Sequence, residues 1–210
     1  MRNLRINKNA DGFSVVEFLI SMTIFLVLLG SAASLFSKSL GTRQRESSRT
    51  DALTSAQAAL NVISRELSNS GFGLTNNGIV SADSNTQKLH FVANIVNTNN
   101  VLTDRGENIT YFFDSTTKSI LRYDANANGN NSPQTSVIIN RISSVDFRYF
   151  NYSGSNSNPT ITDTPTVGTG RVRVTITVDL EDVQGQVKNQ KVKLVSDVTL
   201  RNSDYMLQQY

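Results

Sequence analysis

Two residue types are absent or rare in this sequence, and each shortage excludes a class of site. The chain of 210 residues has no cysteine, which excludes disulfide bonds and thiolate metal sites. It has a single histidine, His90, so a histidine-based catalytic triad and a two-histidine metal site are both excluded. His90 lies in a strand-like pattern and is expected to be an ordinary strand residue. Because Ser and Asp form no catalytic motif either, the sequence predicts a protein that is not an enzyme.

The net charge is also small. The formal value is +3, and the basic residues do not gather into one stretch of the sequence. In the predicted strands, Asp and Glu are interleaved with them. Nucleic-acid binding normally requires a concentrated basic surface. Nucleic acid is therefore not expected as a primary ligand.

Proline is rare as well, and none of the three prolines precedes Pro133. Nothing therefore blocks one continuous helix over residues 13–68. Gly30 and Gly41 are its weak points, since each costs about 1 kcal/mol relative to alanine. Gly71 is well placed to act as a C-terminal cap.

The second half of this predicted helix carries an apolar stripe with helical spacing. We expect a globular domain to pack on that face, with Glu66 among the polar residues that fill the other faces. The stripe comprises Leu53, Ala56, Leu60, Ile63 and Leu67.

The first half of the helix is a long apolar run. From residue 13 to 36 the only ionisable side chain is that of Glu17, and the run exceeds the ~20 residues that a membrane-spanning helix needs. Arg2, Arg5 and Lys8 precede it, so the positive-inside rule places the N-terminus in the cytoplasm and the chain after Lys38 outside. A secretory signal peptide is the alternative. The apolar region of such a peptide is only about 7–15 residues long and is followed by a cleavage site with small residues, whereas the run in this chain is longer.

The start of the run contains a specific motif. A short basic leader ends in Gly12 and is followed by "FSVVEFLIS", with Glu17 four residues after Phe13. This pattern resembles the class III signal of type IV prepilins and type II secretion pseudopilins, whose usual form is G-F-T-x-x-E before a long apolar helix. The resemblance implies that a prepilin peptidase cuts between Gly12 and Phe13 and methylates the new N-terminus on Phe13. It also implies an inner-membrane subunit that an assembly platform moves into a filament with other major and minor pilins, and so to the cell surface.

Later segments resemble one branch of that family, the PilW-type minor pilins and the J-type minor pseudopilins. Major type IV pilins commonly have a proline within the apolar helix and a pair of cysteines near the C-terminus, and this chain has neither. Both departures favour a minor pilin or a pseudopilin. The segments that carry the resemblance are "LNVISRELSNSGFG", "ITYFFD", "SILRYD", "ISSVDFRYFNY" and "VTLRN".

A carboxylate inside an apolar run costs roughly 2.5–3.5 kcal/mol on insertion scales, so Glu17 needs a reason. The positive end of the helix dipole offsets only ~0.3–1 kcal/mol of that cost. The amino terminus of a neighbouring subunit could offset more through a charge-assisted contact. Glu17 would then fix the register of assembly, because a subunit without its partner leaves a buried charge unpaired, at roughly 3–5 kcal/mol. The alternative is that Glu17 lies at headgroup depth and has no role.

The remainder of the chain is predicted to be mostly β-structure. Val172 to Leu180 alternates apolar and polar residues, and "EDVQGQ" leads into a partner strand, which indicates an antiparallel hairpin with one buried face. Residues 151–170 are predicted to be a mobile loop. The candidate strands are residues 88–96, 108–114, 119–124, 136–150, 171–180 and 192–201.

The predicted fold class is therefore α+β and type IV pilin-like, with a long N-terminal helix packed against an antiparallel β-sheet domain. We expect a cleaved leader over residues 1–12 and a helix over residues 13–70, of which residues 13–36 span the membrane. A β-rich extracytoplasmic domain over residues 71–210 completes the expected organisation.

One segment has the spacing of a metal site. "DANANGN" matches the first half of a calcium loop, with Asp124, Asn126, Asn128 and Asn130 as the candidate ligands. The twelfth position is Thr135, so the bidentate glutamate of such a loop is missing. An Asn- and Gly-rich turn without any metal explains the same residues. Both interpretations stay open, and no other cofactor is expected.

Three functions agree with these patterns. The first is a minor type IV pilin that primes or caps a pilus, and the second is a minor pseudopilin of a type II secretion system. The third is a membrane-anchored adhesive or binding module displayed at a filament tip, with its Asn-rich loops as the contact surface.

Overall fold

The computed structural model describes residues 13–96, 101–129, 131–153, 158–180, 182 and 189–208. Helix α1 (Val15–Leu67) comes first, and the strands follow it. The chain divides into two compact units, Met1–Glu46 and Ser47–Tyr210. The last turns of α1 therefore belong to the same unit as the strands, whereas its first half forms a unit of its own.

Helix α1 confirms the predicted long helix and runs without interruption through Gly30 and Gly41. It ends at Leu67 in a tightened turn, in which the N–H groups of Ser68, Asn69 and Ser70 donate to carbonyls three or four residues earlier. Gly71 has a φ of +78°, as a terminating glycine should. Its N–H, however, donates to the carbonyl of Val92 at 3.0 Å and thus ties the end of the helix to a strand.

The predicted apolar stripe is the face of α1 that packs against the rest of the second unit. Its fully buried members are Ala56, Leu60, Ile63 and Leu67, joined by Ala59 one position from the predicted spacing. Full burial of a leucine or isoleucine side chain contributes about 1.5–3 kcal/mol, so this seam is a main source of the stability of the unit.

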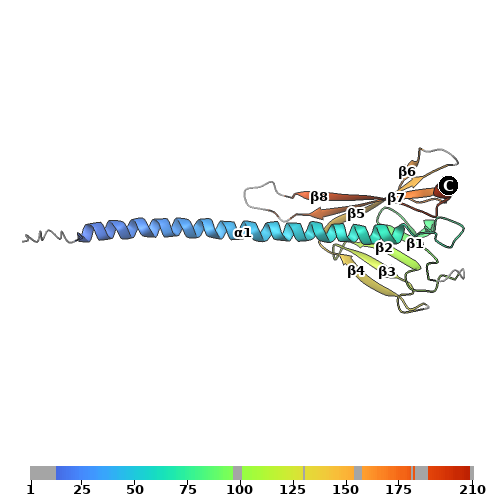
Figure 1. The fold of residues 1–210 in the computed structure, drawn as a ribbon, viewed down its shortest axis with the longest axis horizontal. Coiled ribbons are helices and arrows are strands. Elements are labelled where there is room, and N and C mark those ends of the chain that lie inside the picture. Colours follow the sequence, from blue (N-terminus) through green and yellow to red (C-terminus); the bar gives the residue numbers. More distant parts are fainter. Residues whose placement is uncertain are drawn as a thin grey trace, which may run out of the picture. The chain divides into compact units, whose positions relative to one another are not determined.

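The strands form two four-stranded antiparallel sheets, rather than the single sheet suggested by the sequence pattern (Figure 1). The first sheet has the order β1-β2-β3-β4, and the second has the order β6-β5-β7-β8. The first consists of β1 (Lys88–Val92), β2 (Asn108–Asp114), β3 (Ser119–Asp124) and β4 (Gln134–Ile139), and the second of β5 (Ile142–Asn151), β6 (Thr160–Thr162), β7 (Thr169–Asp179) and β8 (Lys191–Thr199).

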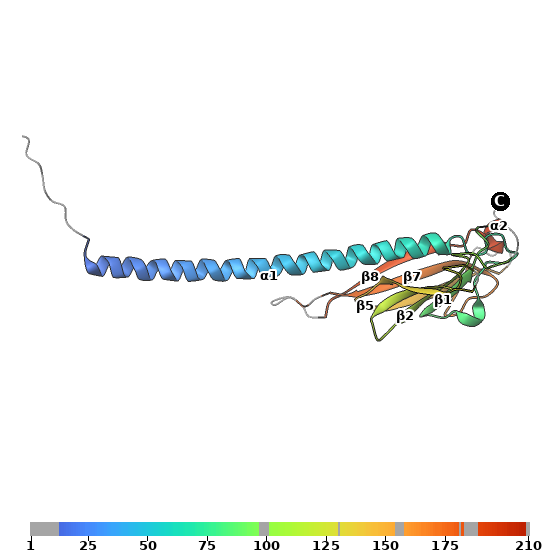
Figure 2. The same cartoon turned by 90° about the horizontal axis from the view of Figure 1, so that it is seen from below.

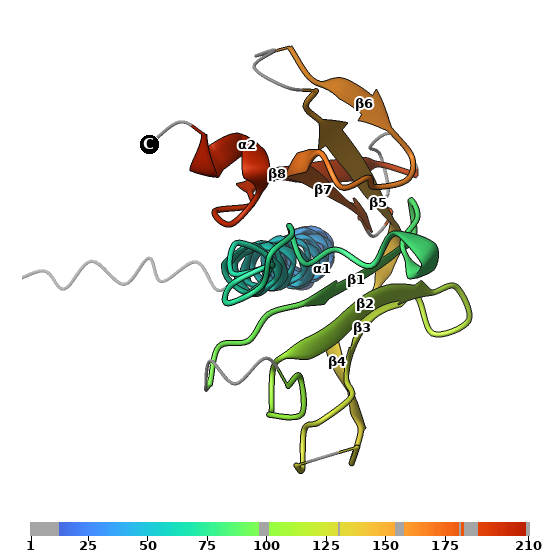
Figure 3. The ribbon, with the colours of Figure 1, turned by 90° about the vertical axis from the view of Figure 1, so that its right-hand side faces the viewer.

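Viewed along its axis, the C-terminal part of α1 lies between the two sheets (Figure 3). The short helices η1 (Ser81–Asp83) and α2 (Asp204–Leu207) lie at the same end of the sheets as the end of α1 (Figure 2). Hydrogen bonds tie β5 of the second sheet to the turn before β1, since Phe147 N–H donates to the carbonyl of Thr86 at 2.8 Å and the Tyr149 hydroxyl to that of Asn85 at 3.0 Å. One continuous apolar core therefore includes α1 and both sheets.

The predicted strand over residues 136–150 is wrong as a single element. β4 ends at Ile139 and β5 begins at Ile142, and the two belong to different sheets. Arg141 between them has a φ of +60°, which turns the chain sharply although no glycine or proline marks the place. The predicted loop over residues 151–170 also contains a short strand, β6, which pairs with the end of β5.

The predicted hairpin is confirmed. β7 pairs antiparallel with β8 from Arg171↔Thr199 to Asp179↔Lys191. Val172, Val174, Ile176 and Val178 of β7 are all buried. The period-two pattern of the sequence therefore identified the buried face of this sheet correctly.

Candidate functional site

The first turn of α1 is closed by a pair of reciprocal contacts. The backbone N–H of Ser14 donates to Oε2 of Glu17 at 3.0 Å, and the N–H of Val16 donates to the Ser14 hydroxyl at 3.3 Å. Ser14 and Glu17 thus form a cap of the capping-box type, S-x-x-E, in which the Ser14 hydroxyl accepts the N–H of Val16 rather than that of Glu17. The sequence signal was present, but the prediction attached Glu17 only to the helix dipole and to a neighbouring subunit.

The first half of α1 exposes its apolar side chains on every face. Phe13 is 77% exposed, and between Val15 and Leu40 every side chain is exposed. An apolar surface of this extent must be covered by lipid or by other protein. By length and composition, α1 is able to cross a membrane.

Two hydroxyl groups within the apolar segment donate to carbonyls of the helix itself. The hydroxyl of Thr23 donates to the carbonyl of Ile20 at 2.8 Å, and that of Ser31 to the carbonyl of Val27 at 2.8 Å. Such bonds to the preceding turn allow polar side chains to lie in an apolar environment without a further partner. Thr23 and Ser31 therefore add no unsatisfied hydroxyl donor to the apolar surface of this segment.

Residues 7–33 match the family model of the prokaryotic N-terminal methylation motif. The chain carries the class III signal of type IV pilins. Comparison with curated proteins and with solved structures gave no match for any part of the chain. The motif supports a type IV pilin-like or pseudopilin-like protein, and a long helix packed against antiparallel sheets is consistent with such a fold.

The matched region places three of the predicted site residues in one short segment. Phe13 comes just before α1, and Glu17 lies in its first turn. The backbone N–H of Ser14, between them, donates to the Glu17 carboxylate. Gly12 and the leader over residues 1–12 lie outside the described residues. The signal implies processing by a prepilin peptidase and incorporation with other pilins.

A polar cluster that the sequence did not reveal fixes the end of α1 on the first sheet of this pilin-like chain. The Tyr111 hydroxyl donates to Oε2 of Glu66 at 2.6 Å, and Nε of Arg122 donates to the same oxygen at 3.0 Å. Arg122 also contacts the buried carboxylate of Asp124 through Nη1 at 3.3 Å. Glu66 lies outside the buried apolar stripe, as expected, but its side chain also bonds across to β2 and β3, which the sequence did not indicate.

Burial and the adjacent Glu66 carboxylate raise the pKa of the Tyr111 hydroxyl well above its usual range, and burial does the same for the pKa of Tyr149. When a tyrosine has a higher pKa in the folded state than in the unfolded state, its contribution to folding stability is fully present below the ordinary tyrosine pKa of about 10. This contribution is lost as the pH rises above that value. We therefore expect the thermal unfolding midpoint of the full chain in detergent micelles to fall above pH ~10.

Absorbance of tyrosinate checks this expectation. Tyr111 and Tyr149, whose pKa values are raised, should ionise only when the domain unfolds, and their absorbance should then appear as a late step. Tyr111→Phe and Tyr149→Phe should each reduce the late absorbance step by one tyrosine, and the double variant should reduce it by two. Ionisation of all six tyrosines in one early step, with the domain still folded, would contradict the assignment.

The predicted calcium loop begins with a carboxylate that already has protein partners. Oδ1 of Asp124 accepts the N–H of Asn126 at 3.1 Å, and Oδ2 accepts the N–H of Gly106 at 3.1 Å. The side chain of Asn126 donates to the carbonyl of Leu102 at 2.8 Å and accepts the N–H of Asn131 at 3.1 Å. These bonds are those of an Asx-type turn.

Of the other predicted ligands, Asn128 lies in that turn, where its N–H donates to the carbonyl of Ser132 at 3.2 Å. Asn130 lies outside the described residues. Among the residues that are described, no group of three His, Cys, Asp or Glu side chains is placed to hold a metal ion. The choice between a turn and a calcium site stays a prediction.

The single histidine lies in strand β1, as expected. Its Nδ1 is 3.0 Å from Oδ2 of Asp83, and its Nε2 is 2.8 Å from Oδ1 of Asn108. Lys88 contacts the other carboxylate oxygen of Asp83 at 2.5 Å. His90 is thereby held within a polar network on the outer face of the first sheet.

Proposed function

We propose that this chain is a minor type IV pilin, a non-catalytic subunit that primes or caps a filament. The observation that carries the proposal is the uncovered apolar half of α1, whose first turn holds Ser14 and Glu17 within the class III signal. A surface of this kind is stable only in lipid or against the equivalent helices of other subunits. The chain would pass from the inner membrane, N-terminus in the cytoplasm, into a filament at the cell surface.

The assignment to a minor subunit is supported by sequence features rather than by the fold. The apolar helix has no proline and the chain no cysteine, unlike most major pilins. The segments that resemble PilW-type and J-type subunits coincide with structural elements, namely the end of α1, β2, β3, β5 and the end of β8. The proposed partners are prepilin peptidase, other major and minor pilins and the inner-membrane assembly platform.

Cleavage before Phe13 is the first step that this function requires. A peptidase must hold the leader in an extended form next to the helix, and Gly12 lacks the side chain that would obstruct this. We expect Gly12→Trp to leave most of the protein unprocessed, heavier than the mature chain by the mass of the leader. Intact-mass spectrometry of the membrane fraction measures this directly.

The matched control is Gly41→Trp, because a Cβ at Gly41 would meet nothing within 4 Å. That variant should be processed normally. Normal processing of Gly12→Trp as well would overturn the assignment of the cleavage site.

Deletion of the gene in its host separates the proposed function from its alternatives. If the chain is a minor pilin, the deletion strain should have few or no surface pili, and a full-length copy of the gene should restore them. Loss of protein secretion with normal pili would instead identify a type II pseudopilin. Normal pili and normal secretion with a loss of attachment would identify an adhesive module.

A further inference from the structure

Strand β8 lies at the end of the second sheet, and no strand among the described residues pairs with its outer edge, which is called the free edge below. The N–H of Leu200 donates to the carbonyl of Gly170, and the N–H of Leu180 to that of Gln190. In an antiparallel ladder the residues between such pairs direct both N–H and C=O away from the partner strand. The odd-numbered residues of β8, which include Lys193, Val195 and Thr199, therefore point their backbone groups outward.

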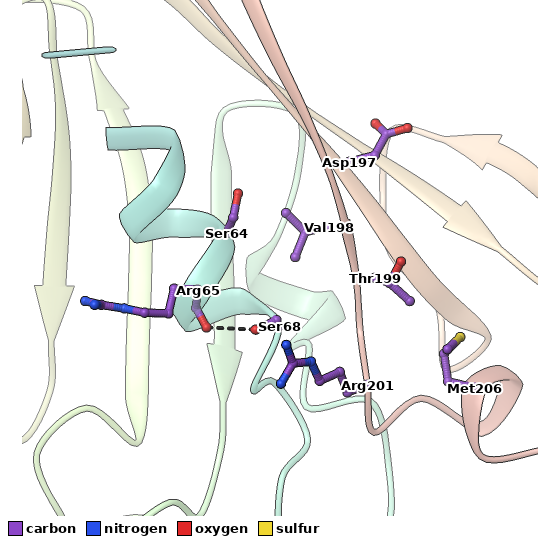
Figure 4. Close-up of a pocket in the computed structure, with 8 residues that line it drawn as sticks. All are labelled: Ser64, Arg65, Ser68, Asp197, Val198, Thr199, Arg201 and Met206. Atoms are coloured by element: carbon purple, nitrogen blue, oxygen red, sulfur yellow. Dashed lines mark hydrogen bonds between the residues drawn. The ribbon is translucent and has the colours of Figure 1, made fainter. Parts of the chain in front are cut away.

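A groove runs between this free edge and the end of α1, as Figure 4 shows. It has a volume of about 790 Å³, and Ser64 and Ser68 of α1 and Val198 and Thr199 of β8 are among its lining residues. Arg201 extends from the end of β8 toward the helix, whereas Arg65 extends to the other side of α1 (Figure 4). Arg65 and Asp197 also line the groove, which thus combines the outward backbone groups of β8 with hydroxyl groups, two arginines and one carboxylate.

The edge is positively charged. Asp197 is held by Arg173 at 2.6 and 2.8 Å, and Asp179 by Lys191 at 3.3 Å. Strands β7 and β8 hold no other carboxylate. Within the described part of the chain, Lys193 and Arg201 therefore form no ion pair. An occupant of this edge should carry negative charge.

Natural sheets often protect a free edge with lysine, which discourages pairing with other chains. In β8 the lysines Lys191 and Lys193 occupy only the first part of the strand. From Val195 to Thr199, next to the groove, the strand has no lysine and no proline, and Val195 is 55% exposed. This half of the edge is left available for pairing.

The described edge strands of a second copy offer no unpaired carboxylate, because β1 has no acid and the one acid of β8, Asp197, is held by Arg173. The free edge strand of the first sheet, β4, is Gln134–Ile139 and contains no acidic residue. Strand β6, at the far edge of the second sheet, has three residues and no acid. Among the described residues, the edges of a second copy therefore match this edge less well than an acidic strand of a different polypeptide.

We propose that the free edge of β8 and the adjoining groove bind an extended acidic segment of a different filament subunit. That segment adds a fifth strand to the second sheet by backbone hydrogen bonding, and its carboxylates contact Lys193 and Arg201. The inference rests on the proposed function only in placing the partner within the same filament.

Defined peptides test this edge directly. The full chain in detergent micelles is mixed with an acetylated peptide of alternating valine and glutamate, and amide hydrogen exchange is followed by NMR. We expect the amides of Val195, Asp197 and Thr199 to become protected, while those of Leu194 and Val198, already bonded to β7, stay unchanged. No protection, or equal protection by a valine–lysine peptide, would overturn the proposal.

Two variants distinguish the contribution of backbone hydrogen bonding to peptide binding from the contribution of charge. Val195→Pro removes one outward N–H without touching the ladder to β7, and proline is tolerated at such edge positions, so protection by the peptide should be lost. Arg201→Gln should weaken binding of the glutamate peptide roughly two- to fivefold, as expected for an exposed ion pair. Arg105→Gln, at an exposed arginine outside the groove, should have no effect.

Binding that is unchanged in both variants would refute the site. The peptide experiment does not depend on filament assembly. A failure of the proposed function would appear in the pilus and secretion phenotypes, whereas a failure of this inference would appear only in peptide binding.

Discussion

Replacing Glu17 by alanine is expected to leave cleavage before Phe13 intact and to reduce incorporation into filaments by roughly two orders of magnitude or more. Within one chain the carboxylate only caps its own helix, which is worth about 1 kcal/mol. The continuous helix of 53 residues should survive that loss. In a filament, removal of the acid would leave the amino terminus of a neighbouring subunit unpaired in low dielectric, at roughly 3–5 kcal/mol, and every 1.4 kcal/mol corresponds to a tenfold change.

The capping box makes it possible to separate these two roles. Glu17→Gln keeps an acceptor at the third helical position, which suffices for a capping box, but removes the charge. Ser14→Ala removes the hydroxyl that accepts the N–H of Val16 and keeps the charge. If Glu17 is an assembly contact, Glu17→Gln should fail in the same way as Glu17→Ala, and Ser14→Ala should assemble nearly normally.

The measurement is the ratio of the subunit in sheared filaments to that in the membrane, with processing followed by intact mass. Normal incorporation of Glu17→Gln would show that the carboxylate acts only as a cap. Normal incorporation of Glu17→Ala would show that it has no role in assembly, the alternative in which the side chain lies at headgroup depth.

The parts of the fold that were predicted correctly depend on short-range periodicity. The stripe from Ala56 to Leu67 and the alternation from Val172 to Val178 each follow from side chains a few residues apart, and both identified buried faces correctly. The signal at Gly12, Phe13 and Glu17 is equally local, and the family model confirms the motif.

The features that were missed depend on contacts distant in sequence. Glu66 looked like a surface residue because its partners, Tyr111 and Arg122, lie more than 40 residues away. The break at Arg141 has no glycine or proline to mark it, so two strands were taken for one. The hairpin pattern of β7 and β8 also does not reveal which strand lies at the sheet edge, and the free edge therefore emerges only from the topology.

Gly78→Ala is expected to destabilise the β-rich unit by about 3 kcal/mol or more, through strain at a positive φ and overpacking against fixed atoms. Gly78 has a φ of +74°, and a Cβ there would lie 2.1 Å from the backbone nitrogen of Gly71 and 2.3 Å from the carbonyl oxygen of Val92. Both contacted atoms are backbone, so no side-chain rotation can relieve them.

The position is where three parts of the chain are tied together. The N–H of Gly71, just after α1, donates to the carbonyl of Val92, and the N–H of Val92 donates to the carbonyl of Gly78 at 2.8 Å. The adjacent Asn77 is buried, and its amide donates to the carbonyl of Thr169 at the start of β7 at 3.0 Å. Displacement of Gly78 would therefore loosen the end of α1, the first sheet and the second sheet together.

Gly129→Ala is the matched control, because Gly129 also has a positive φ, +99°, but a Cβ there would meet nothing within 4 Å. The Gly129→Ala variant therefore measures backbone strain without steric collision, and it should lower the free energy of unfolding by only about 1 kcal/mol. For a domain of this size 1 kcal/mol lowers the melting temperature by roughly 2–4 °C, so the two variants should melt at clearly different temperatures. Equal melting temperatures, measured by circular dichroism on the full chain in micelles, would show that the backbone at Gly78 moves aside, and that α1 and the two sheets are not held together at this point.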